Sequence, residues 1–148
     1  MSTDGQQIVG YATGLDRDGT TLGASQAMLW DTAAGSAVSL GDGNSPSIAY
    51  GVGGGIQVGY VVRTQAEAVL WRGTRQSQVS LHPKNAIVSV ANATDGTRQV
   101  GYAGFDIRVR QEAAKGNKEK RFNYAHLWNG TAASAANIHP YPLNGVSG

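Results

Sequence analysis

The sequence predicts an all-β fold made of three repeated units, because three short phrases recur in the same order along its 148 residues. The first phrase joins Val, Gly and Tyr, and it occurs as Val9–Tyr11, Val58–Tyr60 and Val100–Tyr102. The second ends in Trp and occurs as Ala27–Trp30, Ala68–Trp71 and Ala125–Trp128. The third occurs as Ala37–Leu40, Gln78–Leu81 and Ala135–Ile138, and a weaker fourth phrase occurs twice, as Ser47–Val52 and Ser89–Ala93.

Each phrase has the composition of a short β-strand. The phrases are apolar, rich in Val, Ile, Tyr or Trp, and bounded by Gly, Asn, Asp or Pro. In the second phrase a shared apolar pair lies two residues apart, so it points to one face of the strand. The residue between that pair varies and faces another environment: Met28, Val69 or His126. The glycine inside the first phrase indicates close approach by a neighbouring backbone.

Turn signals separate the strands. Asp4-Gly5 and Asp95-Gly96 precede the first phrase in two units, and Gly54-Gly55 takes that place in the middle unit. These dipeptides supply the positive-φ positions of a tight hairpin. We therefore expect the fourth phrase and the first phrase to pair as antiparallel strands.

The number of strands per unit favours a β-propeller-like arrangement. Four short strands in roughly 40–50 residues are typical of one propeller blade, and a β-solenoid or β-prism is the alternative. We expect a single repeat domain, residues 1–148, with units at about 4–52, 53–94 and 95–148. Only two fourth phrases occur for the three units, so the prediction is three four-stranded antiparallel blades, one of them incomplete.

Three blades do not close a propeller, which typically has about 4–8. An open array leaves apolar faces and unpaired strand edges in water, and both promote association. We expect two chains to combine as a homodimer into a six-bladed ring. The alternative is that the chain is a fragment of a longer protein, against which the initial Met1 is a weak argument.

The order of the phrases resembles the bacterial tandem repeats called HAF repeats. Those repeats run from a Ser-x-Ala-x-Gly strand through Gly-x-x-Val-Gly-Tyr to a His-Ala-Phe-Leu-Trp phrase and a Leu-x-Pro close. The middle unit follows this order with Ser47–Val52, Gly55–Tyr60, Ala68–Trp71 and Leu81–Pro83. The His and Phe of the name phrase are replaced by Gln26 and Met28, by Glu67 and Val69, and by Tyr124 and His126. The resemblance implies a propeller-like fold and an extracellular location, and it assigns no activity.

Composition excludes several classes of function. The chain has no cysteine, so disulfides and thiolate chemistry are excluded. A net charge of +2 is too small to argue for nucleic acid. No apolar run reaches the ~18 residues of a membrane helix, and no signal peptide is visible. The visible chain therefore suggests the cytoplasm and the resemblance suggests the exterior, so the sequence leaves the compartment open.

An inserted hairpin loop, residues 105–122, is the most functional-looking feature. It holds half of the 12 basic residues of the chain, namely Arg108, Arg110, Lys115, Lys118, Lys120 and Arg121. Such a loop is suited to an acidic polymer, a phosphate-rich surface or an acidic partner. The competing interpretation is a solvated hairpin tip, because the loop contains no interleaved aromatic residues to stack on bases.

The matched aromatic residues suggest a second type of site. Trp30, Trp71 and Trp128, with the tyrosines of the first phrase, are candidates for a sugar-binding surface in which repetition supplies avidity. The competing interpretation is that they fill the core between units, and their periodic placement favours it.

Metal and catalytic patterns are weak. His82 and His139 each precede a proline and are interpreted as turn residues, whereas His126 is interpreted as a packed side chain. None has a second ligand at metal-like spacing, and no nucleophile–His–acid order or carboxylate pair stands out. We therefore predict no metal, cofactor or catalytic residue.

The leading functional prediction is a non-catalytic binding or scaffold module for a glycan or protein ligand. Two alternatives remain from the sequence. One is anion or nucleic-acid binding through the 105–122 loop. The other is an enzyme with a site in the propeller channel.

Overall fold

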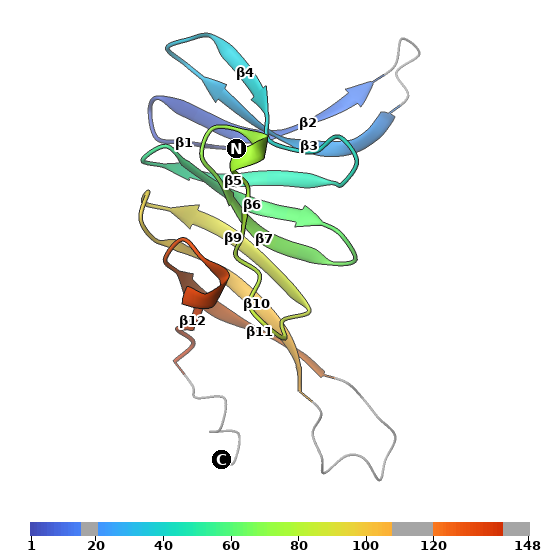
Figure 1. Ribbon diagram of the computed structural model, residues 1–148, viewed down its shortest axis with the longest axis vertical. Coiled ribbons are helices and arrows are strands. Elements are labelled where there is room, and N and C mark those ends of the chain that lie inside the picture. Colours follow the sequence, from blue (N-terminus) through green and yellow to red (C-terminus); the bar gives the residue numbers. More distant parts are fainter. Residues whose placement is uncertain (16–20, 108–119, 141–148) are drawn as a thin grey trace.

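The protein is an all-β chain in the computed structural model, which describes residues 1–15, 21–107 and 120–140 (Figure 1). Helical structure in the described part is limited to two single 3-10 turns, η1 (Arg75–Ser77) and η3 (Ala132–Ser134). No helix among the described residues is long and apolar enough to cross a membrane. The predicted fold class, all-β, is confirmed.

Three four-stranded antiparallel sheets follow one another along the chain. The first contains β1 (Ser2–Thr3), β2 (Gln7–Leu15), β3 (Thr21–Asp31) and β4 (Ser36–Ser39). The second contains β5 (Ser47–Gly53), β6 (Ile56–Val62), β7 (Ala66–Trp71) and β8 (Val79–Ser80). The third contains β9 (Val88–Thr94), β10 (Gln99–Ile107), β11 (Lys120–Trp128) and β12 (Ala136–Asn137). Within each sheet every strand after the first pairs with the strand before it, and none of the three sheets is closed over the described strands.

The first sheet has a strand, β1, that the repeated phrases of the sequence did not predict. β1 pairs with β2 through Ser2 opposite Val9 and Thr3 opposite Ile8. The strand escaped prediction because only two residues belong to it, too few to carry the apolar alternation of the fourth phrase. The strand predicted to be missing is therefore present as β1, and each of the three sheets has four strands.

The predicted hairpin turns are confirmed. The Asp95 carboxylate accepts hydrogen bonds from the backbone N–H groups of Thr97 and Arg98 at 2.8 and 2.7 Å. Gly96 follows with a φ of 95°, a region that glycine enters without strain. The Asp4 turn repeats this arrangement. Hydrogen bonds from backbone N–H groups hold the pKa of both carboxyl groups below its usual value. β9 and β10 pair antiparallel across the Asp95 turn as expected.

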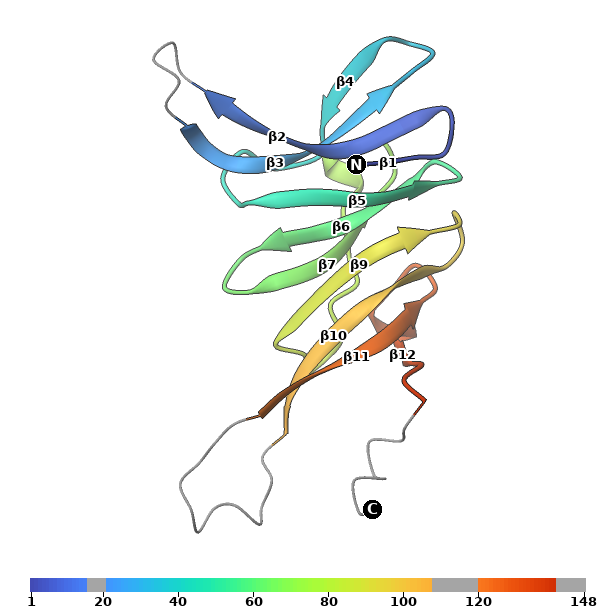
Figure 2. The same ribbon diagram turned by 180° about the vertical axis from the view of Figure 1, so that it is seen from behind.

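The sheets are stacked one above another, with the first at the top and the third at the bottom of Figures 1 and 2. A buried tryptophan lies at each of the two boundaries. Trp71 belongs to a cluster with residues of the first sheet and its following segment, namely Val9, Ala27, Leu29 and Leu40. Trp128 belongs to a cluster with the matching residues of the second unit, Val58, Ala68, Leu70 and Leu81. The sequence repeat is thus also a repeat of packing between sheets.

A repeated hydrogen bond joins the sheets beside these clusters. The Ala27 backbone N–H donates to the Ser47 hydroxyl at 3.0 Å, and the Ala68 N–H donates to the Ser89 hydroxyl at 2.9 Å. Both serines are fully buried. Ser47 is the first residue of β5 and Ser89 is the second residue of β9, so each serine lies at the start of the first strand of its sheet. These bonds therefore fix the position of one sheet relative to the next.

The glycine of the first phrase has the predicted close approach in two units. A Cβ built on Gly59 would overlap the carbonyl oxygen of Ile48, and one on Gly101 would overlap that of Val90. Both glycines face a β-bulge in the preceding strand. A Cβ on Gly10, the matching position of the first sheet, would lie 3.4 Å from the Trp30 ring, an ordinary contact.

We expect Gly59→Ala and Gly101→Ala to lower the free energy of unfolding by about 2–3 kcal/mol each, because the added methyl group meets backbone that cannot yield. Urea unfolding of the purified variants measures the loss. Gly10→Ala is the matched control and should change stability by less than about 0.5 kcal/mol. An equal loss in all three variants would contradict the role assigned to the bulges.

We expect stability to fall in acid through the Asp-Gly turns. The folded carboxyls of Asp4 and Asp95 have a pKa below the usual 3.8, so their contribution is complete above that pH. It is lost as the pH falls through the lower, folded-state pKa. Asp95→Asn keeps an oxygen acceptor without titrating, so it should reduce the slope of stability against pH in acid urea titrations. A slope in Asp95→Asn equal to that of the wild type would contradict the contribution assigned to the turn.

Candidate functional site

Two β-bulges place an extra residue outside the strand pairing. In β5 the pairing with β6 skips Tyr50, and in β9 the pairing with β10 skips Asn92. Bulges commonly redirect a side chain toward a site. The two residues occupy matching positions in their units, and both are exposed.

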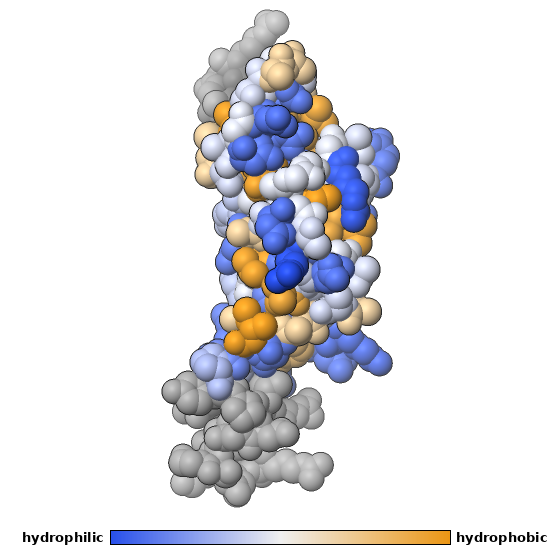
Figure 3. Space-filling view, turned by 90° about the vertical axis from the view of Figure 1, so that its left-hand side faces the viewer, coloured by the Kyte–Doolittle hydropathy of each residue, from blue (hydrophilic) through white to orange (hydrophobic). Residues whose placement is uncertain are grey.

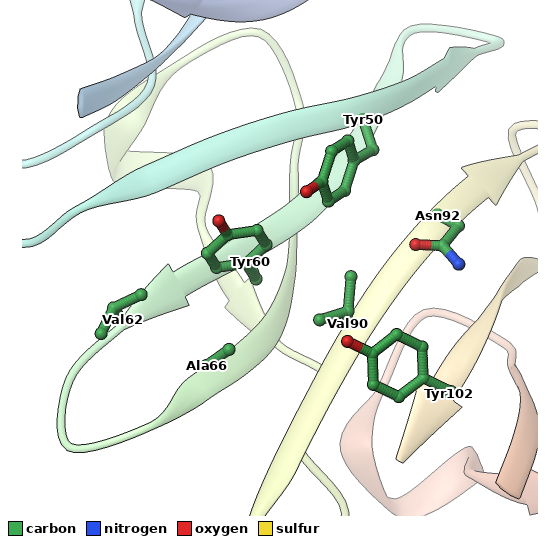
Figure 4. A pocket seen from close by; sticks show the side chains of 7 residues that line it. All are labelled: Tyr50, Tyr60, Val62, Ala66, Val90, Asn92 and Tyr102. Carbon is green, nitrogen blue, oxygen red and sulfur yellow. The ribbon is translucent and has the colours of Figure 1, made fainter. Parts of the chain in front are cut away.

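Tyr50 and Asn92 line one pocket between the second and third sheets. Its volume is about 360 Å³, and Figure 4 shows its lining: Tyr50, Tyr60, Val62, Ala66, Val90, Asn92 and Tyr102. The second sheet supplies the first four of these residues and the third sheet supplies the rest. We call this site the tyrosine pocket.

The tyrosine pocket combines flat apolar rings with neutral polar groups. The Tyr50 and Tyr60 rings lie side by side, with centroids 5.7 Å apart and planes tilted by 45°. Tyr102 and Asn92 lie across from them on the third sheet (Figure 4). Burial raises the pKa of the Tyr60 hydroxyl, and neighbouring phenols, Tyr50 first, raise it further. The Tyr60 hydroxyl is therefore a neutral donor and acceptor at physiological pH.

The tyrosines form a series that crosses all three sheets. Tyr11, Tyr60 and Tyr102 occupy the same position of the first phrase in β2, β6 and β10. The second sheet, which holds Tyr60, lies between the sheets that hold Tyr11 and Tyr102 (Figures 1 and 2). Tyr11 is 56% exposed, and Tyr50, whose ring lies beside that of Tyr60, is 40% exposed.

The three tryptophans are in different surroundings from these tyrosines. Trp71 and Trp128 are fully buried between sheets, which agrees with the core interpretation of the sequence. Their indole N–H groups have no hydrogen-bond partner within the described part of the chain. Trp30 is only half-buried. The ring faces of Trp71 and Trp128 are covered by protein, and only Trp30 retains exposed ring surface.

Most of the basic candidates, Arg108, Arg110, Lys115 and Lys118, lie outside the described residues. Lys120 and Arg121 belong to β11, where their backbones pair with Ile107 and Asp106. The ladder of β10 and β11 thus continues into the segment predicted as the loop 105–122 and shortens that loop at both ends. An aromatic contact across this ladder, between Phe105 and Tyr124 at a centroid distance of 6.4 Å, contributes to its stability.

The histidines have structural partners. His82 lies 2.7 Å through Nδ1 from the Ser89 hydroxyl and 2.8 Å through Nε2 from the Ala86 carbonyl. The carbonyl can only accept, so Nε2 carries the proton and donates to it. His126 is 4% exposed and its Nδ1 lies 2.8 Å from the Tyr124 carbonyl, which confirms that it is packed.

The side chain of Asn137 accepts a hydrogen bond from the backbone N–H of His139, two residues further along the chain. The His139 ring meets the Tyr124 ring edge-on, at a centroid distance of 5.5 Å. Across residues 1–15, 21–107 and 120–140, no three His, Cys, Asp or Glu side chains gather in a group suited to a metal ion.

Sequence reasoning named the matched tyrosines but missed Tyr50 and Asn92. These residues differ between units, so alignment of the repeats gave them no weight. The available signal was the strand glycine: Gly59 and Gly101 each face a carbonyl of the bulged strand, close to the redirected residue. A glycine at the same position in equivalent strands of two units therefore indicates a bulge in the adjacent strand, and with it a side chain that points outward.

Comparison with protein-family models, with curated proteins and with solved structures gives no match for this chain. The resemblance to HAF repeats therefore remains a prediction from the sequence.

Proposed function

We propose that this chain is a non-catalytic binding module with a propeller-like arrangement, that a second copy completes its ring, and that the tyrosine pocket binds carbohydrate. The arrangement is supported by the order of strands. Each sheet is a four-stranded meander, and the first strands of successive sheets lie against each other, β1 against β5 and β5 against β9. Inner strands of propeller blades gather in this way around an axis.

The observation that carries the binding proposal is the convergence of Tyr50, Tyr60 and Tyr102 with Asn92 on one pocket. A sugar ring offers a flat C–H face and a rim of hydroxyl groups. Tyrosine rings match the face, while phenol and amide groups match the rim. The pocket volume of about 360 Å³ lies within the usual range for small ligands.

The chemistry of the lining favours binding over catalysis. The side chains that line the pocket are phenols, one amide and aliphatic groups. These groups bind a neutral polar molecule without changing their own charge. The repeated tyrosines of the first phrase then supply several weak sites, which raise the avidity for a polymer.

We expect a glycan array probed with the wild-type protein to identify bound glycans, and Tyr60→Ala and Tyr102→Ala to weaken that binding about tenfold or more, or about 1.4 kcal/mol. Isothermal calorimetry with the best glycan measures the change. Phe122→Ala removes an exposed ring outside the pocket and is the matched control. Binding that is absent from the array, or that falls equally in the control, would overturn the carbohydrate proposal.

The same titration separates the anion-binding alternative. The double variant Lys120→Ala, Arg121→Ala should bind the glycan as the wild type does, because the lining described for the pocket contains no basic residue. A ligand whose binding depends on these two residues and weakens steeply with salt would instead favour the basic segment.

We expect the affinity for a neutral glycan to be constant from neutral pH to about one unit below the usual tyrosine pKa of 10.0. The pKa of Tyr60 is raised above its usual value, so its phenol is almost entirely neutral over this range. At higher pH the phenolate of Tyr60 forms, and its charge beside Tyr50 then opposes binding. Calorimetry at stepped pH tests this, and a loss of affinity centred near neutral pH would assign binding to another group.

A further inference from the structure

One face of the third sheet is left uncovered by the described part of the chain, although its counterparts are buried. In the first unit the corresponding residues are Val9, Leu29 and Leu40, exposed by 0%, 4% and 0%. In the second unit they are Val58, Leu70 and Leu81, each exposed by 0%. In the third unit Val100 is 40% exposed, Leu127 is half-buried and Ile138 is 51% exposed. Figure 3 shows hydrophobic surface, in orange, near the third-sheet end of the molecule.

This face is hollowed at the position that a tryptophan fills elsewhere. A pocket of about 360 Å³ is lined by Ala93, Thr94, Asp95, Arg98, Val100 and Leu127. Val100 and Leu127 match Val9 and Leu29, the residues of the cluster that contains Trp71. They also match Val58 and Leu70, the residues of the cluster that contains Trp128. We call this pocket the third-sheet hollow.

The first sheet presents the corresponding tryptophan at the other end of the molecule. Trp30 adjoins Leu29 in β3, so the two side chains point to opposite faces of the sheet. Leu29 faces the second sheet, and Trp30 therefore faces away from it. Trp30 is half-buried, whereas its equivalents Trp71 and Trp128 are completely buried.

We propose that Trp30 of one copy of this chain docks in the third-sheet hollow of a second copy. The inference deepens the proposed function and rests on its ring completion by a second copy. Both halves of the contact are present in this chain, and the same pair of surfaces fits together twice within it. The two surfaces lie at opposite ends of the stack of sheets (Figures 1 and 2), so Trp30 does not reach the third-sheet hollow of its own copy.

A two-fold pair satisfies both ends at once. The first sheet of each copy meets the third sheet of the other, so the contact forms twice and no Trp30 remains uncovered. The two boundaries inside the chain support a second copy as the occupant of the hollow. At each of them a tryptophan packs against a valine and a leucine of the preceding sheet, and the boundary between copies would repeat this packing.

The test is a complementation experiment followed by sedimentation equilibrium over a hundredfold range of concentration. Wild type is expected to be a dimer, and Trp30→Ala and Val100→Asp are each expected to weaken the dimer at least about tenfold, the loss typical of a central contact. Trp30→Ala keeps the hollow and Val100→Asp keeps the tryptophan. An equimolar mixture of the two variants should therefore recover a heterodimer held by one intact contact.

Val38→Asp is the matched control, because Val38 is 36% exposed in β4 and belongs to neither docking surface. It should dimerise as the wild type does. Circular dichroism of the single variants, identical to wild type, separates lost docking from lost folding. Acrylamide quenching gives a second measurement: dilution should raise quenching in the wild type, whereas Val100→Asp should be equally quenched at every concentration.

Each outcome is decisive. A wild type that is monomeric throughout, or a dimer that survives both substitutions, overturns the docking. If the wild type forms assemblies larger than a dimer and both variants do not, the docking of Trp30 is supported but the ring of two copies is overturned. Glycan binding by monomeric Val100→Asp is read separately, so a dimer without glycan binding would overturn the tyrosine pocket alone.

Discussion

The structure depends on the insertion of a buried tryptophan from one sheet into the apolar face of the sheet before it. None of the three sheets has the size to be stable alone, since β1, β8 and β12 are two residues long and small isolated sheets are marginal in water. A buried tryptophan removes about 150–250 Å² of surface from water. At about 25 cal/mol per Å² this is worth roughly 4–6 kcal/mol at each boundary, before the cost of ordering the chain. Trp71 and Trp128 therefore hold the stack together.

The same stacking creates the tyrosine pocket. Within the second and third sheets the first strand passes close to the glycine of the second strand, and that approach coincides with a bulge. The bulge redirects Tyr50 and Asn92 away from the ladder, to the side where Tyr60 and Tyr102 lie. The bulge thus exposes one residue in each of the second and third units, and that residue differs between them while the packed positions beside it are shared. The exposed residue can therefore vary without altering the core.

Much of this fold could be predicted from the sequence because the repeat is visible in residues that pack or turn. The Asp-Gly hairpins and the three tryptophan strands follow from local chemistry and from spacing. β1 could not be predicted, since two residues carry no periodicity. The pocket escaped because Tyr50 and Asn92 differ in type, and a comparison of repeats reports what units share. The exposure of Trp30 and Val100 depends on which sheets lie next to each other, which appears only in three dimensions.

The tryptophan of the second phrase stabilises the fold where another sheet of the same chain covers it, as at Trp71, and contributes less where none does, as at Trp30. The most direct measurement is the free energy of unfolding of Trp71→Ala and Trp30→Ala, both in the Val100→Asp chain so that association does not contribute. We expect a loss of about 3–5 kcal/mol for Trp71→Ala, the range for a buried aromatic residue, and a much smaller loss for Trp30→Ala. Equal losses at the two positions would contradict this role of Trp71.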